Sequence, residues 1–181
     1  MSGTAGTYIA LLRGVNVGRA NRVAMADLRR LLEGLGFAGV RTLLNSGNAV
    51  FETDLRGAAD AAARTEAALA AELGVVSRVI VVDAEEIARA VRDNPLAPVA
   101  DPSRFLVAFL APDADTERLR ALRDRDFSPE AFGLVGRTAY LSCVNGITGS
   151  AVAAELARAL GGTVTSRNWA TVLKLLEMTT S

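Results

Sequence analysis

Apolar residues recur along the chain in strand-like runs and at helical spacing, in an order that repeats. Strand-like runs cover residues 8–13, 40–44, 49–53 and 78–82. Helical spacing covers residues 25–35, with Gly36 placed to end the helix, and an alanine-rich helix is predicted over 57–73. The turn Asn45-Ser-Gly-Asn48 is typical of a hairpin, because glycine and asparagine tolerate positive φ. The first half is therefore predicted to run β-α-β-β-α-β.

The same order of elements returns after a proline-rich stretch. Asp83 and Glu86 have the spacing of a capping box, which predicts a further helix after the fourth strand. The segment 94–102 carries three prolines in nine residues, and we expect a linker there. Strands are then predicted at 105–110, 131–135, 138–144 and 163–166, and helices at 115–125, 148–160 and 168–178.

This order predicts an α+β fold made of two consecutive ferredoxin-like βαββαβ units, each an antiparallel sheet with helices packed on one face and each followed by an extra helix. We assign residues 1–94 to the first unit with its capping helix, 95–102 to the linker, and 103–181 to the second unit with its C-terminal helix. In such a unit the loop after the first strand lies at the same sheet edge as the turn between strands two and three. Two polar motifs of the first half are thereby expected to be neighbours.

The first of these motifs is the loop that follows the first strand. Arg13, Gly14, Asn16 and Gly18 lie between an apolar strand and an amphipathic helix, an arrangement that presents backbone N–H groups to an anion. An arginine at the end of the strand is well placed to grip a phosphate or carboxylate. The other interpretation is structural: the asparagines bond their own backbone and the glycines permit the turn.

The second motif is the hairpin turn with Ser46, Gly47 and Asn48, which would join the loop in one ligand-binding edge. By itself it indicates only a turn. The loop has no Gly-Lys-Ser/Thr of a Walker motif, and its Gly-x-x-x-Gly spacing does not fit a dinucleotide fingerprint. Ser46 is not in a nucleophile elbow, because Gly-x-Ser-x-Gly is absent.

A third candidate lies near the C-terminus. Arg167, Asn168 and Lys174 are predicted to form a second anion grip beside a helix N-terminus, with Lys174 the only lysine in the chain. The alternative is that Trp169 anchors this helix to the core and the polar residues face water.

Composition removes several classes of site. The chain of 181 residues has no histidine, which excludes a Ser-His-Asp triad and the commonest zinc ligand. No acidic cluster has calcium-loop spacing, so we expect neither a metal nor a cofactor. The single cysteine, Cys143, suits a reducing cytoplasm, and no apolar run has the length of a membrane span, so the protein is expected in the cytoplasm with no membrane partner.

The distribution of charge along the chain limits the classes of partner further. The 20 basic and 20 acidic residues balance, whereas residues 13–30 hold five arginines against Asp27, a local charge of +4. We therefore expect a small anionic ligand, such as a nucleotide or phosphorylated metabolite. RNA binding is the first alternative, disfavoured because aromatic residues are only 5% and the strands of the first sheet offer just Tyr8 and Phe51. An enzyme is the second; it would have to use arginine, Lys174, a tyrosine or a carboxylate.

Four segments resemble the signature blocks of a bacterial family, the domain-of-unknown-function family 1697 (DUF1697). They are Leu11-Leu-Arg-Gly-Val-Asn-Val-Gly18, Val23-Ala-Met-Ala-Asp-Leu-Arg29, Asn45-Ser-Gly-Asn-Ala-Val-Phe51 and Thr165-Ser-Arg-Asn-Trp-Ala-Thr-Val-Leu-Lys-Leu175. The resemblance implies a cytoplasmic bacterial protein of two ferredoxin-like halves, and it implies no activity. Where the family more often has a loop lysine, this chain has Ala20, so Arg19 or Arg22 would have to take over a ligand contact made there.

Overall fold

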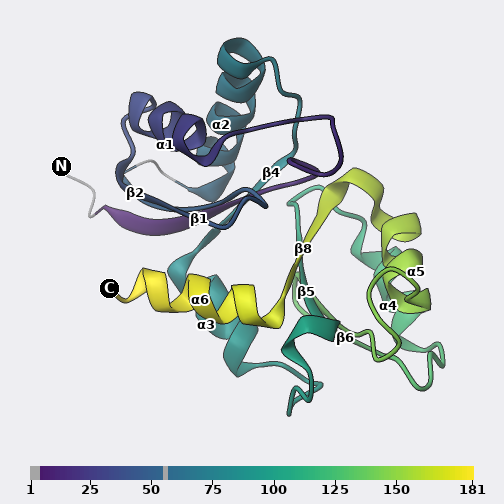
Figure 1. Ribbon diagram of the computed structural model, residues 1–181. Helices are drawn as coiled ribbons and strands as arrows, with labels where there is room; N and C mark the ends of the chain where they lie inside the picture. Colours follow the sequence, from purple (N-terminus) through teal and green to yellow (C-terminus); the bar gives the residue numbers. More distant parts are fainter. Residues whose placement is uncertain (1–4, 55–56) are drawn as a thin grey trace. The chain divides into compact units, whose positions relative to one another are not determined.

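A computed structural model describes residues 5–54 and 57–181 (Figure 1). These residues form two compact units: 5–54 and 57–87 together with 175–181, and 88–174. The assignment of 95–102 as the linker stays a prediction.

The first unit contains a four-stranded antiparallel sheet, as predicted. Its elements are β1 (Gly6–Leu12), α1 (Met25–Gly34), β2 (Ala38–Leu43), β3 (Asn48–Thr53), α2 (Ala58–Leu73), β4 (Val79–Asp83) and the start of α3 (Ala84–Arg92). The strand order is β2-β3-β1-β4, with β1 antiparallel to both β3 and β4. The first and third strands are therefore central, and the loop that follows β1 starts from the middle of the sheet.

The core of this unit lies between the sheet and the helices α1 and α2. Helix α1 buries Leu28, Leu31 and Leu32, whose i, i+3, i+4 spacing places them on one face. This face packs with alternate residues of the central strands, among them Leu12 and Phe51. The apolar residues at helical spacing in the sequence are thus the ones through which the helix contacts the sheet.

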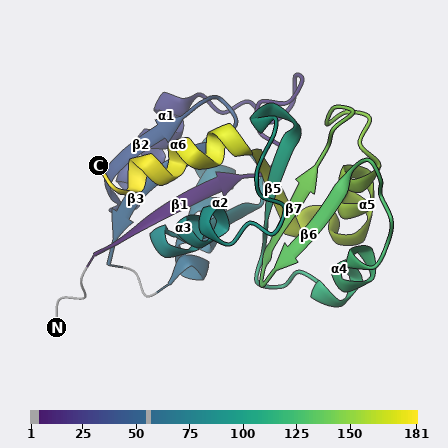
Figure 2. The same ribbon diagram turned by 90° about the horizontal axis from the view of Figure 1, so that it is seen from below.

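The second unit repeats this order of elements. They are a 3₁₀ turn η1 (Pro102–Arg104), β5 (Phe105–Leu110), α4 (Thr116–Arg123), β6 (Ala131–Val135), β7 (Thr138–Ser142), α5 (Ala151–Leu160), a second 3₁₀ turn η2 (Gly161–Thr163), β8 (Val164–Asn168) and most of α6 (Trp169–Thr179). The strand order is β6-β7-β5-β8, again antiparallel. Figure 2 shows α4 and α5 together on one side of this sheet. The predicted α+β architecture of two similar units is confirmed.

Helix starts follow the capping rules where polar residues precede them. The backbone N–H of Asp83 donates to Oε2 of Glu86 at 2.8 Å, and the N–H of Glu86 donates to Oδ1 of Asp83 at 2.7 Å. This reciprocal pair is the predicted capping box. Ser150 accepts from the N–H of Ala153 at the start of α5, which begins at Ala151, three residues later than its predicted start.

The last helix ends in the first unit. Helix α6 starts in the second unit, yet residues 175–181 group with the first. Leu175 is fully buried, and a guanidinium nitrogen of Arg41 donates to the carbonyl of Met178. Within the part of the chain that the structure describes, none of the helices has both the length and the apolar composition to cross a membrane.

Candidate functional site

The connection between β1 and α1, residues 13–24, carries the first predicted motif. Positive φ angles occur at Gly14, Asn16, Gly18 and Asn21. Glycine adopts this conformation freely, and asparagine is the side chain that tolerates it best. Much of the loop is exposed, whereas Val15 is buried and packs into the core, so the loop is anchored from inside.

Asn16 fixes the shape of this loop. Its Nδ2 donates to the carbonyls of Val23, at 2.8 Å, and of Asn45, at 2.7 Å, while its Oδ1 accepts from the N–H of Val23 at 2.9 Å. Its own N–H donates to the carbonyl of Asn21 at 3.0 Å. The bond to Asn45 ties the loop to the β2–β3 turn, so the two motifs are neighbours. The Asn16 side chain, a candidate ligand contact, thus braces the loop against the turn, and we call its three hydrogen bonds the bracket.

Gly47 also has a packing role. The N–H of Leu12 donates to its carbonyl at 2.9 Å. A Cβ at this position would lie 2.7 Å from Cβ of Leu12 and 2.7 Å from Cγ2 of Val15, and φ is +78°. Only glycine fits here, because the turn lies directly against the end of β1.

The other turn residues are likewise engaged. The side chain of Asn48 is fully buried, and its Nδ2 donates to the carbonyl of Leu43 and to Oγ of Ser46, both at 2.8 Å. A buried amide needs such partners. The turn departs from expectation in one respect: a positive φ falls on Leu44, at 58°, and not on either asparagine.

Arg13 begins the loop at the end of β1. Its N–H donates to the carbonyl of Arg78 at 2.9 Å, and Oγ of Ser77 donates to the Arg13 carbonyl at 2.9 Å. These bonds hold the α2–β4 connection beside the β1–α1 loop, and Figure 1 shows both connections at the same end of the first unit. The Arg13 side chain is exposed there, and a Cβ at Gly14 or Gly18 would meet nothing within 4 Å.

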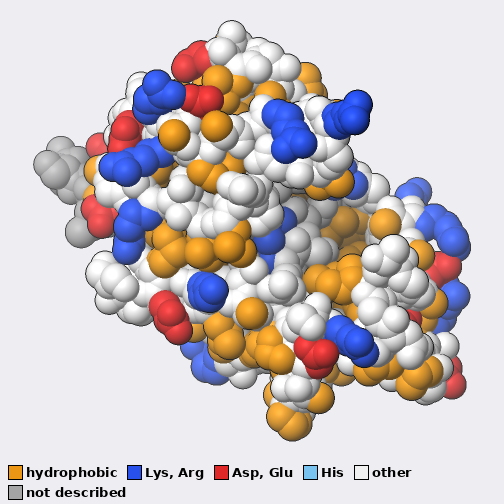
Figure 3. Space-filling view, viewed as in Figure 1, with side chains coloured by type: hydrophobic (Ala, Val, Ile, Leu, Met, Phe, Trp, Pro, Cys, Tyr) orange, Lys and Arg blue, Asp and Glu red, His pale blue; other side chains and the backbone are white. Residues whose placement is uncertain are grey.

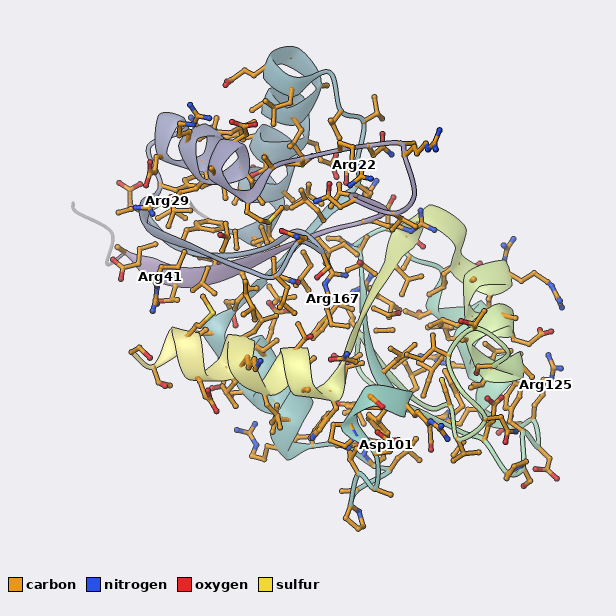
Figure 4. The ribbon with its side chains drawn as sticks, viewed as in Figure 1. Arg22, Arg29, Arg41, Asp101, Arg125 and Arg167 are labelled. Atoms are coloured by element: carbon orange, nitrogen blue, oxygen red, sulfur yellow. The ribbon has the colours of Figure 1, made fainter. Side chains whose placement is uncertain are left out.

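Two arginines that the sequence singled out by the local charge, and as substitutes for the loop lysine, lie on the exposed part of this loop. Arg19 and Arg22 are exposed, and neither forms an ion pair with a residue within 5–54 or 57–181. Basic side chains protrude over the loop in Figure 3, and Arg22 is labelled there in Figure 4. The charge excess of the sequence was the signal that pointed to them.

The local charge is lower than the sequence count, because helix α1 neutralises its own arginines. Arg29 pairs with Glu33 at 2.9 Å, and Arg30 pairs with Asp27. Both pairs are exposed and one helical turn apart, the spacing that favours such contacts. The remaining excess comes from the loop itself, where residues 13–24 hold three arginines and no carboxylate.

The third predicted motif lies in the second unit and is divided between strand β8, which holds Arg167 and Asn168, and helix α6, which holds Lys174. Arg167 is in strand β8, 8% exposed, and its Nη1 donates to Oγ1 of Thr165 and to the carbonyl of Ser166, both at 2.8 Å. Burial lowers the pKa of Arg167 to about 10, so the guanidinium still carries its charge at neutral pH. Oδ1 of Asn168 caps α6 by accepting from the N–H of Thr171 at 2.9 Å, and Lys174 is exposed.

The chain is similar to known proteins in sequence and in fold. The family model described as "Protein of unknown function (DUF1697)" matches residues 6–140. The chain belongs to this family. Among proteins with curated descriptions, none matches the DUF1697 chain. A solved structure, that of the conserved bacterial protein SP0830 from Streptococcus pneumoniae, is similar at a TM-score of 0.82 and 22% identity, over 98% of this chain and 100% of that one. At this identity the likeness shows the fold alone.

Two further reactive side chains of the DUF1697 chain, Cys143 and Tyr140, are buried. Burial raises the pKa of the Cys143 thiol; a hydrogen bond with Ser150 opposes this shift, and the charge of Glu130 adds to it. A buried thiol with a raised pKa is typically inert. Burial, with Asp93 nearby, raises the pKa of Tyr140 to about 12, and its hydroxyl donates to the Ala90 carbonyl at 2.9 Å. Residues 5–54 and 57–181 contain no cluster of His, Cys, Asp and Glu that would hold a metal ion.

The aromatic pair of the first sheet does not form an exposed platform. Phe51 is fully buried and stacks on Phe37 at a centroid distance of 4.5 Å. Tyr8 is partly buried against the same core, 6.2 Å from the Phe51 ring. Stacking of nucleic-acid bases requires exposed rings. These two positions give no support to the RNA alternative.

Proposed function

We propose that the first unit binds a small anionic ligand, a nucleotide or a phosphorylated metabolite, at the β1–α1 loop. The observation that carries the proposal is a loop of fixed shape, residues 13–24, that holds three arginines and no carboxylate. Guanidinium groups bind phosphate oxygens in a bidentate manner, and the positive field of the loop attracts anions.

The residues of the predicted edge have different roles in this proposal. Arg13, Arg19 and Arg22 supply charge, and Gly14 and Gly18 let a ligand approach the backbone, because the space beside them is open. Asn16, Ser46, Gly47 and Asn48 build the loop and its support through the hydrogen bonds and packing described above. Preorganisation of this kind lowers the entropic cost of binding.

In the second unit, Arg167 is buried in β8, Asn168 caps α6, and Lys174 is exposed on that helix. We keep them as a second candidate anion position. The proposal for the loop does not depend on them.

The test is a thermal-shift screen of the full chain against inorganic phosphate, nucleotides, sugar phosphates and short RNAs. A ligand at about a hundred times its dissociation constant should add roughly 2.7 kcal/mol to the free energy of unfolding. The double variant Arg19→Ala/Arg22→Ala should lose this shift, because each charge-assisted hydrogen bond contributes about 1.5–3 kcal/mol.

The matched control is Arg29→Ala/Arg30→Ala, which removes the same charge from the neighbouring helix, where both arginines are paired. It should keep the ligand shift. Equal shifts in both double variants, or equal losses, would show that the loop arginines do not form the site. A hit confined to RNA would move the function to nucleic-acid binding.

A further inference from the structure

Three large aliphatic side chains are exposed at the same end of the first unit. Val17 is 72% exposed, Val76 is 82% exposed and Leu44 is 54% exposed. They come from the β1–α1 loop, the α2–β4 connection and the β2–β3 turn. Single exposed aliphatic residues are ordinary on a protein surface, whereas exposed aliphatic residues that are grouped together often mark an interaction site.

Hydrogen bonds hold the three loops at one end of the sheet. Asn16, next to Val17, donates to the carbonyl of Asn45, next to Leu44, at 2.7 Å. Ser77, next to Val76, donates to the carbonyl of Arg13 at 2.9 Å. The three exposed aliphatic residues therefore belong to loops that are tied together at one end of the sheet. We call residues 13–23, 44–47 and 75–78 the loop end.

Leu44 also has an unfavourable backbone conformation. Its φ is 58°, in the left-handed region, where a bulky residue other than glycine or asparagine is an outlier. The strain holds a leucine outward at the tip of the turn. Strained residues that persist on a surface are concentrated at sites of function.

We propose that the loop end binds an anionic phospholipid surface, with Val17, Leu44 and Val76 entering the interface and the loop arginines contacting lipid phosphates. This inference rests on the proposed anion binding and names the source of the phosphate. Exposed aliphatic residues beside arginines are the combination by which a protein lies on a membrane without crossing it. The expectation of no membrane partner came from the lack of a span-length apolar run, and surface binding requires no such run.

The composition of the loop end favours lipid over a protein or a nucleic acid. The residues that dominate the affinity of protein interfaces are seldom leucine or valine, which are the apolar residues exposed at the loop end, and single-stranded nucleic acids stack on aromatic rings. The loop end contains no aromatic residue and no methionine. Its aliphatic and cationic side chains match the acyl and phosphate layers of a lipid interface, respectively.

The test is sedimentation of the full chain with vesicles of phosphatidylglycerol and phosphatidylcholine in equal parts, and with phosphatidylcholine alone. We expect binding to the anionic vesicles only, weaker at high salt because counterions screen the arginines. Arg19→Ala/Arg22→Ala should reduce the partition coefficient by about 25-fold, since each basic residue near an anionic surface contributes about fivefold. Val17→Ser/Val76→Ser should reduce it by about tenfold or more, because apolar burial is lost.

Two controls remove similar groups elsewhere. Val135→Ser/Ile147→Ser replaces two aliphatic residues of the second unit that are each 39% exposed, and Arg29→Ala/Arg30→Ala removes paired arginines of α1. Both should bind anionic vesicles like the unaltered chain. Equal weakening by control and loop-end variants would overturn the inference.

The same samples separate the two proposals. Binding of soluble phosphate or nucleotide without vesicle binding would overturn the lipid inference and leave the proposed function in place. Vesicle binding that survives Val17→Ser/Val76→Ser would overturn the insertion step. No response to soluble anions or to vesicles would overturn both proposals, and binding of polyglutamate in place of vesicles would replace the lipid with an acidic protein partner.

Discussion

At the scale of single residues, Asn16 holds the shape of the β1–α1 loop, a role that the sequence motif alone left open. Asn16 was equally consistent with a ligand contact and with a turn, since an asparagine at positive φ occurs in both. In the structure its side chain bonds backbone groups of Val23, seven residues away, and of Asn45, twenty-nine residues away. A contact at that separation has no signature in a local sequence pattern.

Replacement of Asn16 by alanine tests this bracket. Asn16→Ala removes three side-chain hydrogen bonds of 2.7–2.9 Å, each with a net contribution of about 1 kcal/mol, so urea unfolding should show a loss of about 2–3 kcal/mol. Asn21→Ala is the control: Asn21 also has a positive φ, but its side chain makes one bond of 3.5 Å, to Gly14. Equal destabilisation by both variants would mean that backbone strain, and not the bracket, sets the stability of the loop.

At the scale of elements, most of the fold could be predicted from the sequence. Period-2 and period-3.6 apolar patterns give the element order, and the helix that follows β4 was predicted from Asp83 and Glu86. These signals are local, so a sequence carries them. The buried position of Arg167 in β8 was missed, because the strand was predicted to end at residue 166 and a charged side chain is normally expected at a surface.

The capping box gives an element-scale prediction. Asp83→Ala leaves the N–H of Glu86 without its acceptor at the start of α3, and we expect a loss of about 1 kcal/mol in the free energy of unfolding. Glu86→Gln keeps an oxygen that accepts from the N–H of Asp83, so it should cost less. Thermal unfolding followed by circular dichroism measures both; a larger loss for Glu86→Gln would show that charge, and not capping geometry, matters here.

At the scale of the whole molecule, the C-terminal seven residues belong with the N-terminal unit. Neither helical periodicity nor the proline-rich stretch indicates this, because it depends on contacts between opposite ends of the chain. The loop end could be located only in part for the same reason. The pairing of strands predicted that the loop and the turn meet, whereas the exposure of Val17, Leu44 and Val76 follows from tertiary packing.

Leu175 tests the assignment of the C-terminal residues. Leu175→Ala removes a fully buried side chain and should cost about 2–5 kcal/mol. Lys174→Ala, one residue earlier and exposed, should leave the free energy of unfolding nearly unchanged. Hydrogen exchange then locates the effect: protection should fall in β1, β3 and β4 of the first unit, and a fall confined to the second unit would contradict the assignment.

The return of α6 to the first unit also has a consequence during synthesis. A ribosome produces the chain from its N-terminus, and domains generally fold as they emerge. The sheet of residues 6–83 is complete early, but Leu175 and the Met178 carbonyl that accepts from Arg41 are made only after residues 88–174. The first unit is therefore completed only after the second unit has been synthesised, and nascent chains halted before residue 175 should leave the first unit open to chaperones.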